Sequence, residues 1–454
     1  MKVIVVGAGI GGLAAAIGLR RAGHEVLIFD KSSLSHEVGA AINVQPNAAR
    51  VLAKWGFDFK RARLVDAKSI TVTSGDELLD IHEIECSNME EKYGFDFFYS
   101  HRVDLHSELM LLATGEEGQG KPAMIRNKCE VVDYDTINGS VTLANGTIMT
   151  ADLIVGADGV HSSAVEKIVG YKNPAIPTGI SCFRTLIPVQ ELRDDPECAV
   201  FMEKMEGKLR MFAWPKHKHQ KVVWYPCREN EVLNIAVFCS DKEDLDPSHD
   251  WNNCIPTEVL LNELKDCHPT LRHLLAKTKD VRLWELLFRA PLPSWHQGKL
   301  VILGDAAHPM LPFQGQAGAQ AIEDGCALGI LFSNLPEGTI TEETISARLS
   351  SFEKIRRNHA SATQLISNGG YYQSDEERNS AKIYMGDGQA VPSTPEDYQE
   401  FFYSYDVAKL CKKELERLTQ PFGSGISDAS NSGWEEENMG KVPGNSNERV
   451  AVGA

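Results

Sequence analysis

The sequence lacks a surplus of basic residues, a long apolar run and a closely spaced pair of cysteines. Its 454 residues carry a formal net charge of −17 at pH 7. An acidic chain is a poor partner for nucleic acid, whose phosphates require a basic face. No uninterrupted apolar stretch reaches the roughly 20 residues of a membrane helix. The sequence therefore predicts neither a nucleic-acid partner nor a membrane span.

The ten cysteines are spread along the chain without a CxxC pair, which argues against a disulfide framework and against a zinc site. Several stand in apolar stretches, such as Cys239 in "NIAVFCS" and Cys326 in "EDGCALG". Buried, reduced thiols of this kind are typical of a cytoplasmic protein. We therefore expect no metal site and a cytoplasmic location.

The first twenty residues, "MKVIVVGAGIGGLAAAIGLR", fit either a secretion signal or a nucleotide-binding strand, turn and helix. A nucleotide site needs a second strand that ends in an acidic residue. Here Gly7-x-Gly9-x-x-Gly12 follows the strand "KVIVV", a helix is expected over residues 13–22, and "EVLIFD" supplies a second strand ending at Asp30. Because cleavage would remove this whole unit, the sequence favours a dinucleotide-binding fold.

Each residue of this unit has a physical task. Gly7 permits a tight turn, Gly9 lets a pyrophosphate approach the backbone, and Gly12 lets the helix pack closely on the strand. The free N–H groups at the helix start bind phosphate, and Asp30 accepts hydrogen bonds from ribose hydroxyls. The unit alone does not decide between NAD and FAD.

Two further motifs each place a glycine and an aspartate directly after a buried strand. The first, "ADLIVGADGVHSS", contains Asp158 and Gly159, and the second, "KLVILGDAAHPM", contains Gly304 and Asp305. Open α/β sheets place ligands at such strand ends, where a carboxylate can bind sugar or ribityl hydroxyls. After the second motif, Pro312 precedes a glycine-rich turn and a helix start whose N–H groups suit an anionic oxygen.

These three motifs, in this order, resemble those of the flavoprotein aromatic hydroxylases, which are single-component FAD monooxygenases of the para-hydroxybenzoate hydroxylase fold. The similarity covers roughly residues 1–370, and the salicylate-hydroxylase-like branch of fungal secondary metabolism is the most similar. The resemblance implies an α/β fold with three parts. These are a Rossmann-like FAD-binding domain, an inserted antiparallel β-sheet domain for the substrate and a C-terminal helical segment.

The resemblance also implies which residues contact the cofactor. Gly39 and Ala41, in "EVGAAINVQPNAARVL", would lie beside the flavin, and Arg102, in "SHRVDLHSEL", would reach the FAD. Two positions depart from the family's pattern, because Val165 replaces an arginine and Ala317 replaces a glycine. The remaining assignments are Gly7, Gly9 and Gly12 to the pyrophosphate, Asp30 to the adenosine ribose, Asp158 and Gly159 to FAD and a passing nicotinamide, Asp305 to the ribityl chain, Gly318 to the pyrimidine edge of the flavin, and Pro312 to the cofactor site in general.

The chain is too long for one compact core, and two or three domains are expected. The runs "SCFRTLIPV", "LRMFAWP", "KVVWYP" and "NIAVF" predict an antiparallel sheet that covers the flavin. A capping-box pattern at Thr339 predicts a long helix that ends at Gly369 and Gly370, and residues 395–418 are expected to be helical. The predicted division is 1–70, 100–175 and 280–365 for FAD, 71–99 and 176–279 for the substrate, 366–422 for C-terminal helices and 423–454 for a disordered tail.

Two residues of the predicted sheet are candidates for a catalytic role. Arg184, in "SCFRTLIP", stands where the resembling fungal enzymes often have an arginine, and its guanidinium would hold a phenolate or carboxylate; a salt bridge is the alternative. Tyr225, in "VVWYPCR", would donate to a substrate oxygen, with a core tyrosine as the alternative. Trp224 either lines the pocket or belongs to the core. His308 is expected to support its turn rather than transfer protons.

The resemblance implies an FAD-dependent monooxygenase that uses NAD(P)H and molecular oxygen. Through a flavin C4a-hydroperoxide it would hydroxylate or epoxidise an aromatic or indole-type small molecule, while the protein orients the reactants and excludes water. The alternatives are an FAD-dependent oxidase or reductase without oxygen insertion and a catalytically inert flavin-binding interaction protein. No Trp-x-Trp-x-Ile-Pro stretch supports a halogenase. The substrate, the choice between NADH and NADPH and the oligomeric state stay open.

Overall fold

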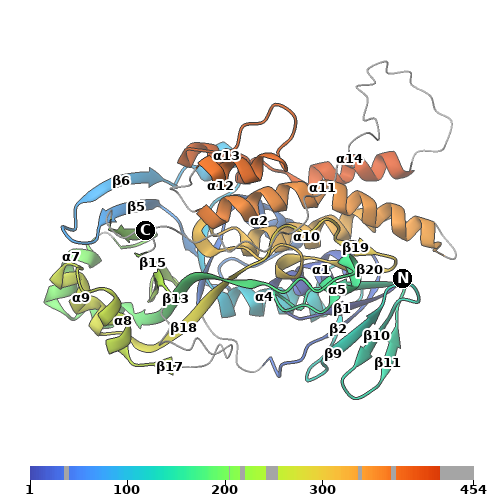
Figure 1. The fold of residues 1–454 in the computed structure, drawn as a ribbon, viewed down its shortest axis with the longest axis horizontal. Helices are drawn as coiled ribbons and strands as arrows, with labels where there is room; N and C mark the ends of the chain where they lie inside the picture. Colours follow the sequence, from blue (N-terminus) through green and yellow to red (C-terminus); the bar gives the residue numbers. More distant parts are fainter. Residues whose placement is uncertain are drawn as a thin grey trace.

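The computed structural model describes residues 1–34, 40–203, 205–214, 220–241, 254–335, 340–369 and 375–419. Figure 1 shows two large sheets at opposite ends of the longest axis. Two long strands, β13 (Ile176–Pro188) and β18 (Lys279–Phe288), run from the eight-stranded sheet toward the six-stranded one. This arrangement brings one end of the larger sheet against the smaller sheet.

The six-stranded sheet has the order β19-β20-β12-β1-β2-β8. Its central strand β1 (Lys2–Val6) pairs in parallel with β2 and β12, and β12 pairs in parallel with β20. The strands are buried on both faces, as parallel strands between helices are. Because β1, β12 and β20 are parallel neighbours, the turns that follow them meet at one edge. The other bounds are α1 (Ile10–Arg21), β2 (Glu25–Phe29), β8 (Met124–Arg126), β12 (Leu153–Gly156), β19 (His296–Gln297) and β20 (Leu300–Ile302).

The N-terminal residues form the expected strand, turn, helix and strand rather than a secretion signal. Strand β1 lies at the centre of the sheet, and most of α1 is buried. The helix starts at Ile10 rather than Leu13, because Gly9 and not Gly12 is its N-cap. It ends near Gly23, whose φ of 89° suits a residue without a side chain.

The eight-stranded sheet has the order β17-β18-β13-β16-β15-β14-β5-β6. Its pairs are antiparallel except for β14 and β5, which are parallel because β5 comes from a distant part of the chain. The sequence predicted an antiparallel sheet and missed this parallel pair. The remaining bounds are β5 (Ser69–Ser74), β6 (Asp80–Glu85), β14 (Lys208–Ala213), β15 (Lys221–Cys227), β16 (Val232–Ser240) and β17 (Cys254–Ile255).

The two faces of this sheet have different partners, because successive side chains of a strand point to opposite faces. One face packs on helices at the outer end of the molecule through a cluster that includes Phe183, Phe212 and Trp224. Those helices are α6 (Val189–Arg193), α7 (Ala199–Met202), α8 (Thr257–Glu263) and α9 (Pro269–Ala276). The other face, which carries Cys182 and Phe238, contacts Leu311 of the segment after β20. This second face, which we call the inner face, is therefore turned toward the six-stranded sheet.

Two smaller sheets complete the β structure of the described residues. The sheet β3-β7-β4 joins β3 (Ala41–Val44), β4 (Val65–Asp66) and β7 (Phe98–His101), and the sheet β11-β10-β9 joins β9 (Val131–Asp135), β10 (Ser140–Leu143) and β11 (Ile148–Thr150). The turns of the second sheet contain Gly139 and Gly146, whose positive φ angles follow the Asn-Gly pairs of the sequence.

The C-terminal part is helical. Helix α11 (Glu342–Gly369) ends where the sequence predicted, while Thr339, Gly370 and the tail 423–454 lie outside the described residues. The expected helix over 395–418 is two helices, α13 (Pro395–Tyr403) and α14 (Val407–Thr419). The other helices are α2 (Pro46–Trp55), α3 (Met89–Tyr93), α4 (Arg102–Thr114), α5 (Ala164–Val169), α10 (Ala317–Leu331) and α12 (Asp375–Lys382).

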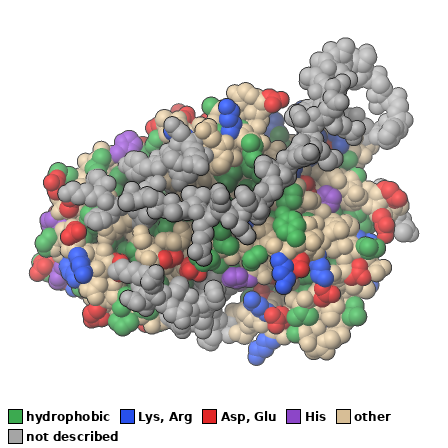
Figure 2. Space-filling view, viewed as in Figure 1, with side chains coloured by type: hydrophobic (Ala, Val, Ile, Leu, Met, Phe, Trp, Pro, Cys, Tyr) green, Lys and Arg blue, Asp and Glu red, His purple; other side chains and the backbone are tan. Residues whose placement is uncertain are grey.

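The surface carries charged side chains of both signs, in agreement with the composition of the sequence. Figure 2 shows acidic and basic side chains interspersed over the face in view. Among the described residues, no helix combines the length and the hydropathy that crossing a bilayer requires.

Candidate functional site

The three sequence motifs meet at one edge of the six-stranded sheet. Val6 at the end of β1 lies beside Gly156 at the end of β12, and Gly156 lies beside Ile302 at the end of β20. Backbone hydrogen bonds continue past the strands, since the N–H of Ala157 donates to the carbonyl of Val6 at 2.8 Å. Turns separated by about 150 residues in the sequence are therefore neighbours in space.

The glycine-rich turn is tightly packed on one side and open on the other. A Cβ at Gly12 would overlap the carbonyl oxygen of Gly7, so the helix approaches the turn as closely as glycine allows. A Cβ at Gly9 would meet nothing within 4 Å. Gly9 is the N-cap of α1, and no side chain caps this helix end. The first-turn N–H groups thus face open space that an anion such as a pyrophosphate fits.

Two side chains hold the peptide groups of Ala8 inside this turn. Asp30 Oδ2 accepts a hydrogen bond from the Ala8 N–H at 2.7 Å, and His106 Nε2 lies 2.7 Å from the Ala8 carbonyl oxygen. Asp30 Oδ1 accepts from the N–H and hydroxyl of Ser32. Asp30 therefore braces the turn. His106 was missed in the sequence, although it stands one helical turn after Arg102 in the segment "SHRVDLHSEL".

Asp158 lies in the turn after β12, and only one of its two carboxylate oxygens accepts a hydrogen bond. Its Oδ2 accepts a hydrogen bond from the Tyr134 hydroxyl at 3.2 Å, whereas its buried Oδ1 has no partner. Burial raises the pKa of Asp158. A buried acceptor without a donor is uncommon in folded proteins, so this oxygen fits the hydroxyl of a bound ligand. The next residue, Gly159, has a φ of 83°.

Asp305 lies deep in the molecule but keeps an accessible side chain, as expected for a residue that lines an internal ligand site. Burial raises the pKa of its carboxyl group, while nearby His308, Arg102 and Arg289 oppose the change. Arg289 ties the two motifs together, because Nη1 donates to the carbonyl of Ala306 at 3.0 Å and Nη2 to that of Val160 at 2.5 Å. No sequence motif pointed to Arg289.

Behind the turn after β20, a buried polar network holds the start of α10. His308 Nε2 lies 2.6 Å from Asp324 Oδ2, which also accepts from the Gly304 N–H. The expectation that His308 supports its turn is confirmed. Arg356 pairs with Glu323 at 2.7 Å and with Asp324 at 2.8 Å, and all three side chains are fully buried.

The two carboxyl groups of this network differ in acidity. Burial raises the pKa of Glu323 to about 7, and the negative charge of Asp324 adds to this rise, while Arg356 and Asn47 oppose it. Burial also acts on Asp324, but its interactions with His308 and Arg356 outweigh it and lower the pKa of Asp324 to about 2. The pKa values of the two carboxyl groups are therefore shifted in opposite directions.

The segment before α10 is held by two residues of the loop and helix after β3. Gln45 Nε2 donates to the Gln314 carbonyl at 3.0 Å, and Asn47 Nδ2 donates to Glu323 at 2.9 Å. Pro312 begins a short 3₁₀ helix, and Ala317 starts α10 without a positive φ, so the alanine in place of the family's glycine is accommodated.

Two residues beside this segment were also expected near the flavin. The Ala41 N–H donates to Asn234 Oδ1 of β16 at 3.0 Å, so this N–H already has a partner within the protein. A Cβ at Gly318 would lie 2.7 Å from Ile42 Cδ1, so a larger residue at that helix start would require the Ile42 side chain to shift. Gly39 lies outside the described residues.

Arg184 lies on the inner face of the eight-stranded sheet. Its guanidinium carbon sits 4.4 Å from the centre of the Trp284 ring, and its buried Nε has no hydrogen-bond partner. No ion pair joins Arg184 to a carboxylate among the described residues, so the salt-bridge alternative is not supported there. Apolar side chains surround it on the same face: Ile180, Cys182, Ala236, Phe238, Leu286 and Leu311. Arg282 of β18 lies directly opposite Arg184 in the sheet, so this face carries two guanidinium groups among the apolar side chains.

Tyr225 and Trp224 point to opposite faces. Trp224 packs edge-on against Phe201 and Phe212 in the outer core, so its core interpretation is confirmed. Tyr225 lies on the inner face and packs on Tyr99, with ring centres 5.0 Å apart. Burial raises the pKa of Tyr225, so its hydroxyl keeps its proton at neutral pH.

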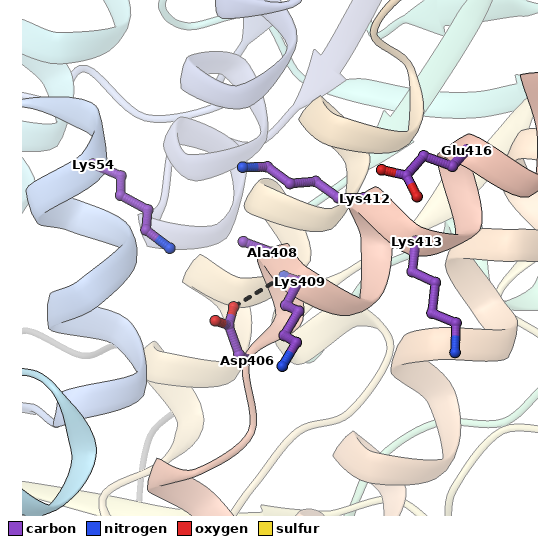
Figure 3. Close-up of a pocket in the computed structure, with 7 residues that line it drawn as sticks. All are labelled: Lys54, Asp406, Ala408, Lys409, Lys412, Lys413 and Glu416. Atoms are coloured by element: carbon purple, nitrogen blue, oxygen red, sulfur yellow. Dashed lines mark hydrogen bonds between the residues drawn. The ribbon is translucent and has the colours of Figure 1, made fainter.

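A surface cavity elsewhere is unrelated to these residues. Figure 3 shows the cavity of ≈ 370 Å³ between α2 and α14. Its lining is Lys54, Asp406, Ala408, Lys409, Lys412, Lys413 and Glu416. None of the residues that the sequence assigned to the site lines it.

Metal ligands were not expected, and one group of suitable side chains occurs at the outer end of the large sheet. Asp195, Cys198 and His273 place one ligand atom each within 4.8 Å of one another. Lys277 already pairs with Asp195, and His273 Nε2 lies 2.8 Å from the same carboxylate. The negative charge of Asp195 is thus balanced by side chains of the protein.

Comparison with known proteins gives consistent matches. Residues 1–365 match the family described as "FAD binding domain". The chain is 36% identical over 430 residues to the FAD-dependent monooxygenase cfoG of Aspergillus candidus, covering 94% of this chain and 97% of that protein. It is 32% identical over 433 residues to hispidin-3-hydroxylase of Neonothopanus nambi, covering 93% and 98%. A solved salicylate hydroxylase substrate complex shares the fold, with a TM-score of 0.71, 23% identity and coverage of 91% and 98%.

Proposed function

We propose that this chain, which belongs to the FAD-dependent monooxygenases of the aromatic hydroxylase family, uses NAD(P)H and molecular oxygen to hydroxylate or epoxidise an acidic aromatic compound. The α/β fold and the FAD cofactor that the sequence predicted are confirmed. When bound, FAD supplies two-electron chemistry with a nicotinamide and with oxygen. The protein itself binds, orients and shields the reactants.

We infer that the three strand-end turns hold the FAD. The open space at Gly9 and the uncapped start of α1 support a pyrophosphate there. The unpartnered Oδ1 of Asp158 and the accessible carboxylate of Asp305 support contacts with hydroxyl groups. The other proposed FAD contacts are Gly7, Gly12, Asp30, Gly39, Ala41, Arg102, Gly159, Pro312 and Gly318.

The observation that carries the proposed substrate class is the half-buried guanidinium of Arg184, whose buried Nε has no hydrogen-bond partner and which lies opposite Arg282. A buried donor without an acceptor is uncommon, and an acidic oxygen of a ligand would supply the acceptor and the negative charge. A planar aromatic ring with an acidic oxygen satisfies both parts of this surface, because the ring covers the apolar side chains and the oxygen meets the guanidinium. The similarity to a hispidin-3-hydroxylase supports a hydroxylation reaction on a small molecule.

Tyr225 is the second proposed substrate contact. Because burial raises its pKa, the hydroxyl is a hydrogen-bond donor rather than a phenolate. A donor at this place would hold a substrate oxygen and leave the apolar wall to orient the ring. The side chain also belongs to the core cluster around Tyr99, so its removal is expected to cost stability as well.

We further propose a cytoplasmic location, the domain division stated above and a nicotinamide that visits the site transiently. All ten cysteines are free thiols in the structure, eight of them buried, which supports a reducing compartment.

The test is an oxygen-labelling experiment on the purified holoenzyme. Phenols, salicylates, styrylpyrones and indoles are screened for stimulated NAD(P)H oxidation, and the product is then formed under ¹⁸O₂. The proposal predicts one labelled oxygen atom in the product. Unlabelled product would indicate an oxidase or reductase, and no stimulation by any acidic aromatic compound would indicate an inert flavin-binding protein.

A further inference from the structure

The turn between β15 and β16 contains three consecutive residues with left-handed backbone. Arg228, Glu229 and Asn230 have φ angles of 51°, 57° and 66°. None is a glycine, and residues with a Cβ rarely adopt this region, so such a run persists only where surrounding contacts hold it. The tip of this hairpin is therefore fixed by its neighbours.

The strongest of these contacts joins Arg228 to helix α4. Arg228 Nε and Nη2 donate to Asp104 Oδ2 and Oδ1 at 2.7 and 2.8 Å, in the paired geometry that arginine forms with a carboxylate. Asp104 stands in the first turn of α4, where the helix dipole favours a negative charge. The hydrogen bond to Asp104 raises the pKa of Arg228. We call this ion pair the clasp.

The clasp lies between the two halves of the proposed active site. Asp104 is two residues after Arg102, whose N–H donates to the Ala40 carbonyl at 2.8 Å beside the cofactor-binding turns. Arg228 is three residues after Tyr225, in the turn that follows β15. The ion pair thus joins the cofactor side to the substrate side, in addition to the hydrogen bond from the Ala41 N–H to Asn234 of β16.

Strand β15 is also in register with Arg184. Arg184 in β13 lies opposite Ala236 in β16, and Ala236 lies opposite Val223 in β15. All three belong to one row across the inner face. A shift of β15 would therefore move the wall that carries Arg184.

We propose that Asp104 and Arg228 are positioning residues, whose ion pair fixes the inner face of the substrate sheet relative to the FAD-binding turns. This inference rests on the proposed function of that site. The clasp touches neither substrate nor cofactor and acts through Tyr225 and Arg184. Its loss leaves FAD bound but misplaces the substrate, so reducing equivalents are lost without oxygen insertion.

The same helix offers a matched control. Arg61 Nε and Nη2 donate to Glu108 of α4 at 2.7 and 2.5 Å, so this pair has the same geometry. It joins α4 to the segment before β4, and neither Arg61 nor Glu108 belongs to the eight-stranded sheet. The contact of that segment with the hairpin is made by Arg63, which pairs with Glu229 and Glu231 and is unchanged in the control. Replacement of Arg61 removes an equivalent ion pair without releasing β15.

The experiment compares Arg228→Ala, Asp104→Ala, their double variant and Arg61→Ala as holoenzymes. The clasp predicts normal FAD content in all four. It predicts a coupling ratio, product formed per NAD(P)H oxidised, that falls about tenfold in both single clasp variants. The double variant loses no more than either single one, because one interaction is removed. Arg61→Ala keeps the wild-type coupling ratio.

Equal coupling in Arg228→Ala and Arg61→Ala would overturn the inference. So would additive losses in the double variant, because they would mean that the two residues act separately. Hydrogen exchange of the β15 amides gives a readout that does not need turnover. Faster exchange in Arg228→Ala than in Arg61→Ala supports the clasp even if the wild type forms no product, and equal exchange overturns it.

Discussion

The Gly9→Ala substitution separates binding of the cofactor from stability of the fold. Gly9 has a φ of −70° and a ψ of −177°, which alanine adopts without strain, and the added Cβ meets no protein atom within 4 Å. We therefore expect the unfolding free energy of the apoprotein to change by less than about 0.5 kcal/mol. The new methyl group instead fills the space assigned to the pyrophosphate.

The expected loss of affinity follows from the hydrogen bonds at the start of α1. Displacing the pyrophosphate by one methyl group costs one or two charge-assisted hydrogen bonds, roughly 1.5–3 kcal/mol each. The dissociation constant for FAD then rises about tenfold to more than a hundredfold. Gly12→Ala is the contrasting variant, because its Cβ would overlap the carbonyl of Gly7 and should reduce both stability and affinity.

The assay is a titration of apoprotein with FAD, followed by quenching of flavin fluorescence, beside thermal unfolding of the same apoprotein. Wild-type affinity in Gly9→Ala would refute the placement of the pyrophosphate at this helix start. An unstable Gly9→Ala apoprotein would refute the claim that the space is open.

The other predictions concern charge. Asp305→Ala should yield mostly colourless apoprotein, and a fully yellow variant would remove Asp305 from the cofactor site. Arg184→Ala should keep FAD but lose coupled hydroxylation, and an unchanged product yield would exclude the proposed role. For Glu323, the folded pKa of about 7 exceeds the ordinary 4.5, so the folded state holds a proton that the unfolded state has lost. Wild-type stability should therefore fall as pH rises from about 4.5 to 7, by up to about 3 kcal/mol, and stay level above. Glu323→Gln should lack this slope in urea unfolding at each pH, and an unchanged slope would contradict the assignment.

The sequence predicted those parts of the site that depend on local backbone geometry. The turns at Gly7, Asp158 and Asp305 each follow a buried strand, and parallel strands bring their ends to one edge whatever their order in the chain. Glycine spacing and strand ends are local signals, so they are visible without a structure.

The residues that the sequence did not reveal act over long distances in the chain. Arg289 bonds the carbonyl of Val160, and Arg228 bonds Asp104, over separations of more than 100 residues. Neither arginine carries a mark of its partner in the sequence, because an arginine can pair with any of the many carboxylates and carbonyls of the chain. The same limit explains why the salt-bridge alternative for Arg184 stayed open until the structure was known.

The break between α13 and α14 shows a different limit. The apolar pattern continues through this region, so the sequence predicts one helix. In the structure Asp406 Oδ1 accepts a hydrogen bond from the Lys409 N–H at 3.0 Å and so starts a second helix. A cap of this kind is recognised only once the chain direction on either side is known.

The central claim is that FAD occupies the three neighbouring strand-end turns. It is tested most directly by the visible absorption spectrum of the purified chain after FAD has been added and unbound cofactor removed. We predict flavin bands in stoichiometric amount for the wild type and their loss in Asp305→Ala. A wild-type protein that takes up no FAD, or an Asp305→Ala variant that takes up as much as the wild type, would contradict the account.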